Sequence, residues 1–175
     1  AVILLKEIKF DIAFTSKLKR ASDTLDIILK GINQDNIPTE RNIALNERDY
    51  GDLVGQNKAE AAKKFGDEQV QIWRRSYDRP PPGGESLKNT ADRVIPYLNK
   101  QILPHVFEGK NVIVSAHGNS IRAIVMALKK YSPDEILKTE IGWCEPWIFQ
   151  FENTTLLNLN IKSRPDSESM SKLPN

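Results

Sequence analysis

Cysteine and histidine are scarce in this chain, and long hydrophobic runs are missing. Cys144 is the only cysteine among 175 residues, and there are two histidines. An intramolecular disulfide is therefore excluded, and these three side chains cannot complete a zinc site by themselves. The longest apolar runs are about five residues, far short of the roughly 20 that span a bilayer, and no signal-peptide pattern opens the chain. These absences predict a cytoplasmic protein without a metal.

The chain also lacks a strong charge of either sign. It has 25 basic and 23 acidic residues, for a net charge of +2. This charge is too small to predict nucleic acid or a membrane surface as a partner. A composition of 39% hydrophobic and 27% charged residues is typical of one globular domain. We expect a single domain over residues 1–161, followed by a polar, flexible tail over residues 162–175.

What the chain does contain is an alternation of strand and helix patterns. Residues 10–14 form a short apolar run that is typical of a strand. Apolar side chains then recur every three or four residues over 17–31, which predicts a helix with Thr15 and Ser16 as candidate N-caps. Residues 111–115 read as a buried parallel strand that opens directly into a helix over 118–128. Further helices are expected over 1–7, 57–65 and 71–75, from 86 to the glycine at 109, and from 132 onward, with Asn57, Ser86 and Ser132 as caps. Residues 37–52 are expected to form a short strand and a long functional loop.

The pattern changes near the end, where residues 147–151 and 156–161 alternate around a turn at 153–155. This alternation predicts an antiparallel hairpin at one edge of the sheet. Strands that alternate with helices favour a three-layer α/β/α fold with a mostly parallel sheet. Ligands of such sheets bind beyond the carboxyl ends of the strands, where helix N-termini attract anions.

Two predicted strand ends carry suitable side chains: Thr15-Ser16 with Arg20, and His117-Gly118-Asn119-Ser120 with Arg122. His117 can exchange a proton near neutral pH, Gly118 lets the backbone approach a ligand, and Asn119 both donates and accepts. An isolated histidine is more often a hydrogen-bonded core residue. The strand-to-helix context favours a phosphoryl-transfer site centred on His117 instead.

Basic side chains from separate segments could converge on the same anion. Arg20, Lys58, Arg74 and Arg75 each lie near the end of a predicted element. A guanidinium group binds phosphate or carboxylate with two parallel hydrogen bonds, which makes the adjacent arginines suggestive. Neighbouring arginines on a solvated helix face are an equally good explanation.

One carboxylate stands in the predicted functional loop. Glu47, beside Arg48 and Tyr50, is a plausible general acid if the site removes it from water, although a surface role is common for such a residue. His105 has no chemical neighbours in the sequence, and we interpret it as structural or exposed. We expect Cys144 to be a small packed side chain.

Five short motifs occur in order between residue 1 and about residue 127. They are Phe14-Thr15-Ser16-x-x-x-Arg20-Ala21, Leu45-Asn46-Glu47-Arg48-x-Tyr50-Gly51, Trp73-Arg74-Arg75, Gly84-Glu85-Ser86-Leu87 and Ala116-His117-Gly118-Asn119-Ser120. Together they closely resemble the cofactor-dependent phosphoglycerate mutases. The loop motif separates these mutases from the wider histidine phosphatase superfamily.

In that family one histidine is transiently phosphorylated, a second histidine stabilises the transferring group, and a glutamate donates and accepts the proton. The resemblance implies that Glu47 is the acid/base and His117 the second histidine. It implies interconversion of 3-phosphoglycerate and 2-phosphoglycerate in glycolysis and gluconeogenesis, primed by 2,3-bisphosphoglycerate and without metal. The partners are then small phosphorylated three-carbon acids, and a homo-oligomer stays open. The implied substrate contacts are Arg20, Arg48, Asp49, Tyr50, Lys58, Arg74, Arg75, Gly118 and Asn119.

The sequence departs from the family at three places. The family's nucleophilic histidine lies in an Arg-His-Gly motif at the end of its first strand, and this motif is not in the sequence. Neither His105 nor His117 can replace it, so we expect a mutase-like domain that lacks its N-terminal strand and nucleophile loop through truncation. The connection Pro82-Gly83-Gly84 stands where many members carry a long insertion. Gly142-Trp143-Cys144-Glu145-Pro146 stands where they have Thr-Gly before the proline.

Two other functions remain open. A histidine-type phosphatase acting on a small phosphometabolite differs only in letting water accept the phosphoryl group. A noncatalytic phosphometabolite-binding relative would have lost the first histidine, and it predicts a stable fold that begins at Ala1. The pairs Glu47-Arg48 and Arg74-Arg75 favour the mutase.

Overall fold

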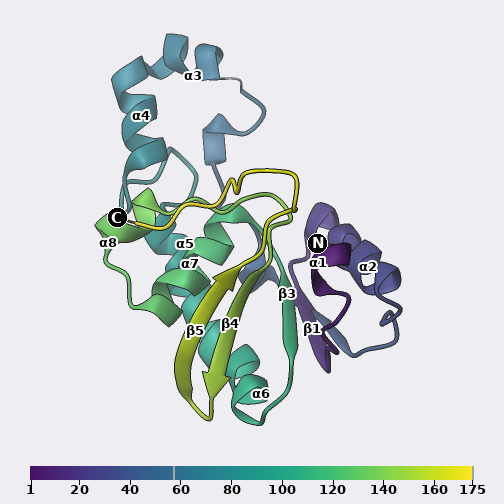
Figure 1. Cartoon of the computed structure of the whole chain (residues 1–175). Coiled ribbons are helices and arrows are strands. Elements are labelled where there is room, and N and C mark those ends of the chain that lie inside the picture. The colour runs from purple at the N-terminus through teal and green to yellow at the C-terminus, as the bar shows by residue number, and fades with distance from the viewer. Residues whose placement is uncertain (57, 175) are drawn as a thin grey trace.

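Three parallel strands form the centre of the computed structural model, which describes residues 1–56 and 58–174 and only the backbone of Lys58. Strand β1 (Ile12–Thr15) lies between β2 (Thr39–Arg41) and β3 (Val112–Ser115). Figure 1 shows β1 and β3 side by side. In the register, Ala13 pairs with Thr39 on one side and with Ile113 on the other. The predicted strands at 10–14 and 111–115 are confirmed, each one or two residues shorter at its start.

Successive residues of β1 point to opposite faces of the sheet, and each face has its own cover of helices. Phe14 is fully buried among side chains of α5 (Leu87–Tyr97) and α7 (Gly118–Lys129). Ala13 is equally buried on the other face, against the apolar stripe of α2 (Lys19–Gly31). This arrangement gives helix, sheet and helix layers, and the predicted α/β fold class is confirmed.

The long helix predicted from Ser86 to Gly109 is divided into three parts. Helix α5 continues into a π-helical turn at Leu98–Ile102 and then into α6 (Leu103–Phe107). Pro96 and Pro104 have no N–H to donate, so a uniform α-helical pattern cannot run through this region. The remaining helices are α1 (Val2–Leu5), α3 (Lys58–Phe65), α4 (Asp67–Arg75) and α8 (Pro133–Lys138), with 3₁₀ turns at Ile43–Leu45 and Gly51–Leu53.

The predicted helix caps have mixed outcomes. Ser86 accepts a hydrogen bond from the N–H of Asn89 at the start of α5, and Ser132 caps α8 through Glu135 in the same way. The expected cap of Asn57 on α3 lies outside the described residues. The prediction that Thr15 or Ser16 caps α2 is wrong, because the residue before this helix is Leu18, which has no side-chain acceptor.

The predicted antiparallel hairpin is present as β4 (Trp147–Glu152) and β5 (Thr155–Ile161). Asn153 makes the turn with a positive φ of 52°. The two strands form a sheet of their own, and Ile148 packs against the buried cluster that contains Ile113 of β3. The hairpin therefore shares the core of the parallel sheet (Figure 1).

Part of the polar C-terminal segment runs back over the body of the molecule. Lys172 and Glu140 exchange backbone hydrogen bonds as an antiparallel bridge. The carboxylate of Glu145 accepts hydrogen bonds from the Ser169 hydroxyl and from the N–H groups of Met170 and Ser171. In the part of the chain that the structure describes, no helix combines the length and apolarity needed to cross a membrane.

Candidate active site

The carboxyl ends of β1 and β3 lie side by side, as the sequence predicted for its two polar strand ends. Thr15 pairs with Ser115 in the register, and the Thr15 hydroxyl donates to the Ser115 carbonyl at 2.7 Å. The residues that follow these strands therefore meet. The Ser16 hydroxyl lies 2.8 Å from Nε2 of His117, which is only 7% exposed.

The side chain of Ser16 contacts His117 and does not cap the N-terminus of α2. Its Oγ accepts a hydrogen bond from the N–H of Leu18 at 3.1 Å and contacts His117 on its other side. A hydroxyl that accepts one hydrogen bond can still donate its proton, so Ser16 can donate to an imidazole nitrogen that carries no proton. A neutral His117 with an unprotonated Nε2 fits this geometry.

Burial and the neighbouring charges together lower the pKa of His117. Burial lowers the pKa of His117 below its usual value, the positive charge of Arg20 lowers it further, and the negative charge of Glu47 opposes them. The imidazole is thus kept neutral in the free protein near neutral pH. An anion bound beside it would reverse this balance and favour the protonated form.

Glu47 lies over the first turn of α7, directly beside His117. Its Oε1 accepts the backbone N–H of Arg48 at 2.8 Å and that of Asn119 at 3.2 Å. A Cβ placed on Gly118 would lie 4.0 Å from Oε2 of Glu47, so the carboxylate passes close to this glycine. Free N–H groups and the helix dipole favour negative charge at this position.

Asn119 connects the helix to the functional loop through its side chain. Its amide nitrogen donates to the Tyr50 hydroxyl at 3.0 Å, and its amide oxygen accepts from Arg122 at 3.3 Å. Arg122 also donates to the carbonyl of Thr139 at 2.9 Å. The structure thereby brings together the predicted residues Glu47, Tyr50, His117, Gly118 and Asn119.

Arg48 is the most deeply buried of the predicted substrate contacts, at 5% exposure. Its guanidinium group donates to the carbonyls of Glu85 at 2.7 Å and Trp73 at 2.6 Å, and it lies 5.0 Å from the ring centre of Tyr50. Burial lowers the pKa of Arg48 below its usual value, and Tyr50 and Glu47 oppose the shift. Arg48 therefore links the functional loop, on which it lies, to the last turn of α4 by a hydrogen bond.

Helices α3 and α4 extend away from the rest of the protein and pack around a small cluster of Leu53, Ala61 and Val70 (Figure 1). Arg74 and Arg75 form the exposed end of α4, immediately after the carbonyl that Arg48 holds. The other predicted basic residues are less informative: Arg20 is exposed on the first turn of α2, and the side chain of Lys58 lies outside the described residues.

Asp49 shapes the backbone of the loop. Its carboxylate accepts the N–H of Gly51 at 2.8 Å, and its carbonyl accepts the N–H of Glu85 at 2.7 Å. Its own N–H donates to the Glu85 carboxylate at 3.1 Å. In the structure Asp49 thus forms the turn, and its predicted contact with a substrate stays a prediction.

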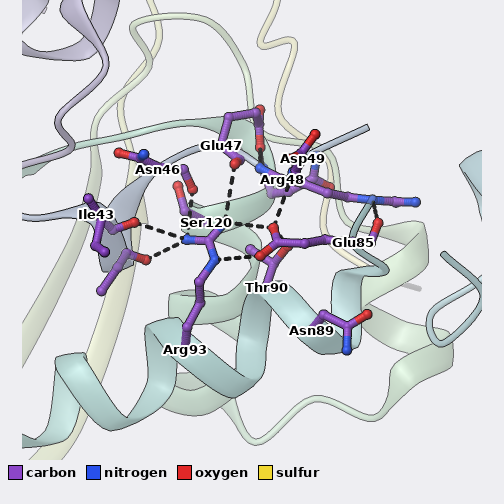
Figure 2. A network of polar contacts seen from close by, with 12 residues as sticks. Ile43, Asn46, Glu47, Arg48, Asp49, Glu85, Asn89, Thr90, Arg93 and Ser120 are labelled. Atoms are coloured by element: carbon purple, nitrogen blue, oxygen red, sulfur yellow. Dashed lines mark hydrogen bonds and ion pairs between the residues drawn. The ribbon is translucent and has the colours of Figure 1, made fainter. Parts of the chain in front are cut away.

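Arg93 was not predicted from the sequence as part of the site. Its side chain extends from α5 to the functional loop that carries Glu47 (Figure 2). One feature of the sequence does point to Arg93: it lies between Ala91 and Val94, which both face the core. A half-buried cation at the border of an apolar helix stripe needs a partner. Within the described residues no group of three acidic, histidine or cysteine side chains gathers to hold a metal ion.

Comparisons with known proteins agree with this geometry. The family model described as "Histidine phosphatase superfamily (branch 1)" matches residues 2–161. A protein of Rhodopseudomonas palustris named 2,3-bisphosphoglycerate-dependent phosphoglycerate mutase is 57% identical over 141 residues, covering 81% of this chain and 68% of its own. A protein of Nitrobacter hamburgensis with the same name is 59% identical over the same coverage.

Solved structures with this fold share much less sequence. A mycobacterial glucosyl-3-phosphoglycerate phosphatase superposes with a TM-score of 0.74 at 20% identity, covering 91% of this chain and 80% of its own. An alpha-ribazole phosphatase from Shigella flexneri gives a TM-score of 0.74 at 16% identity, with coverages of 91% and 76%. At these identities the likeness supports the fold alone.

Proposed function

This chain belongs to the histidine phosphatase superfamily, and from that membership we propose that it acts as a 2,3-bisphosphoglycerate-dependent phosphoglycerate mutase in cytoplasmic glycolysis and gluconeogenesis. The observation that carries the proposal is the 57% identity, over 141 residues, to a relative of that name. The site geometry supports it, since Glu47 and His117 meet at the N-terminus of α7. The substrates would be 3-phosphoglycerate and 2-phosphoglycerate, with 2,3-bisphosphoglycerate as primer.

In this proposal His117 and the first turn of α7 hold the phosphoryl group. The N–H groups at this helix end and the exposed charge of Arg20 attract a phosphate dianion. Once the dianion is bound, His117 takes up a proton and donates a hydrogen bond to an equatorial phosphoryl oxygen. A fixed charge at that place stabilises the transition state of phosphoryl transfer.

Glu47 would transfer the proton of the substrate hydroxyl. In the free protein its Oε1 is bonded to the N–H of Asn119. A phosphoryl group that takes this N–H releases a carboxylate oxygen toward the substrate. Binding and activation of the base would then be a single event.

The end of α4 would close over the remainder of the substrate. Arg48 holds the carbonyl of Trp73, so Arg74 and Arg75 stand beside the functional loop. Two guanidinium groups at this position suit the carboxylate of a phosphoglycerate or the second phosphate of the primer. We propose that Arg48, Asp49 and Tyr50 complete the contacts from the same side, and that Lys58 is a further substrate contact.

The covalent step needs a phosphoryl-accepting histidine, and His105 does not suit that role. It lies on α6, before β3, with its ring centre 5.9 Å from that of Phe14. His117 follows β3, so the two histidines lie at opposite ends of this strand. The residues of this chain described above account for binding, charge stabilisation and proton transfer.

The proposal is tested by following the fate of the phosphoryl group. The protein as its organism makes it is incubated with 3-phosphoglycerate and a trace of 2,3-bisphosphoglycerate, and ³¹P NMR records the products. We expect 2-phosphoglycerate to form much faster than inorganic phosphate, at a rate that depends on the primer. Faster release of inorganic phosphate would identify a phosphatase, and binding without any product would identify a noncatalytic relative; either result contradicts the proposal.

A further inference from the structure

One arginine outside the predicted site donates several hydrogen bonds to the backbone around Glu47. Arg93, on α5, donates to the carbonyls of Ala44 at 2.7 Å, Asn46 at 3.1 Å and Glu47 at 3.1 Å. A longer bond of 3.4 Å reaches the carbonyl of Ile43. Figure 2 shows the guanidinium group at the centre of these acceptors.

The remaining donors of Arg93 form a two-bond ion pair with Glu85. Nε lies 2.9 Å from Oε1, and an Nη lies 2.8 Å from Oε2. Both side chains are 26% exposed, so the pair is largely removed from water. A planar guanidinium can serve a carboxylate and three carbonyls together, whereas a lysine ammonium acts as a point charge.

Glu85 in turn accepts hydrogen bonds from the two residues that follow Glu47. Its carboxylate accepts the N–H of Asp49 at 3.1 Å and the Thr90 hydroxyl at 3.2 Å, and its carbonyl accepts from Arg48 at 2.7 Å. Burial would raise the pKa of Glu85, but the hydrogen bonds and charge of Arg93 and the Asp49 N–H outweigh it and lower the pKa. Glu85 is therefore ionised at neutral pH.

These contacts hold the backbone on both sides of Glu47. Residues 46–49 have little regular secondary structure, and their backbone carbonyls and N–H groups are fixed by the ion pair on one side. The side chain of Glu47 points to the other side, where it meets the N–H of Asn119. We infer that Arg93, paired with Glu85, is a positioning residue that holds Glu47 in register with His117 and the start of α7.

This inference rests on the proposed function, because it assigns the ion pair a role in the reaction that Glu47 would catalyse. Replacing Arg93→Lys keeps the charge but loses the simultaneous contacts, and Glu85→Gln keeps the shape but loses the charge. In both variants Glu47 gains freedom to move. A displacement of about 1 Å in a catalytic group can cost about 100-fold in rate.

The first test compares steady-state kinetics of the two variants with wild-type protein. We expect kcat to fall by about 10- to 100-fold while KM changes less than about threefold, together with a displaced pH profile of kcat. The double variant should be about as slow as either single one, since both break the same unit. Controls are Lys88→Met and Asp92→Asn, which break an exposed ion pair on the same helix and should keep the wild-type rate.

The second test does not require turnover. In wild-type protein the Asn119 amide proton should exchange slowly with deuterated solvent, as NMR measures it, because it is hydrogen bonded to Glu47. Arg93→Lys and the isosteric Glu85→Gln should speed this exchange, whereas the controls should keep the wild-type rate. An unchanged Asn119 exchange rate, or an unchanged kcat, would overturn the inference. A wild-type protein without mutase activity that still shows the Asn119 effect would overturn only the proposed function.

Discussion

Replacing Glu47 with glutamine separates the chemistry of this carboxylate from its structural contacts. Oε1 of Glu47 accepts two backbone N–H groups, from Arg48 at 2.8 Å and Asn119 at 3.2 Å. The amide oxygen of a glutamine can accept the same two bonds. What is lost is a negative charge at a helix N-terminus, which contributes about 0.3–1 kcal/mol. We therefore expect the free energy of unfolding to fall by no more than about 1 kcal/mol.

Two functional quantities should move in opposite directions in Glu47→Gln. Loss of a general acid/base lowers turnover by about 100- to 10,000-fold. Anion binding should tighten by up to about fivefold, because a bound phosphate no longer meets a like charge beside the α7 N-terminus. The pKa of His117 should fall further, since Glu47 is the charge that opposes its lowering.

The assays are the mutase rate, calorimetric titration with 3-phosphoglycerate, and urea unfolding. The matched control is Asp52→Asn, which removes one negative charge from an exposed position of the same loop. The reasoning is refuted if turnover of Glu47→Gln stays within about threefold of wild type. It is refuted equally if the control loses as much activity as the variant.

Three further outcomes follow from the same contacts. The pKa of His117 is lowered in the free protein, and a bound dianion should raise it, so that anion binding takes up a proton. The affinity for sulfate should therefore rise as the pH falls from 8 through the His117 pKa of the complex, and it should level off below the His117 pKa of the free protein. Calorimetry in two buffers of different ionisation enthalpy can measure both the affinity and the proton uptake. Arg48→Lys should cost about 2 kcal/mol in urea unfolding and raise KM, because two partly buried carbonyls lose their guanidinium donors and the end of α4 is released. Phe14→Ala should cost about 3–5 kcal/mol of unfolding free energy, since Phe14 is fully buried.

Much of the fold was predictable because local patterns and tertiary packing agree. The strand at 12–15, the apolar stripe of α2 and the hairpin at 147–161 all have the period of the element they form. The division of the helix after Tyr97 was not predictable from its apolar face, which continues through Leu98 and Ile102. Pro96 and Pro104 interrupt the backbone hydrogen bonds of an α-helix in this region, but they do not interrupt the spacing of the apolar side chains.

The candidate site was predictable where a residue type and its place in an element carry the information. His117 and Glu47 were found in this way. The contacts of Arg93 were not, because a guanidinium on α5 that reaches carbonyls 46 to 50 residues earlier leaves no periodic signal in the sequence. Ser16 was misread for a related reason: its side chain turns toward His117, 101 residues away.

We propose that Glu47 and His117 at the start of α7 form the phosphoryl-transfer site of a phosphoglycerate mutase. The primed mutase rate of His117→Ala beside wild type, with circular dichroism to confirm the fold, tests this proposal directly. We expect active wild-type protein, and a variant whose fold is retained while turnover falls by at least about 100-fold. Near-normal turnover in a folded His117→Ala would contradict it.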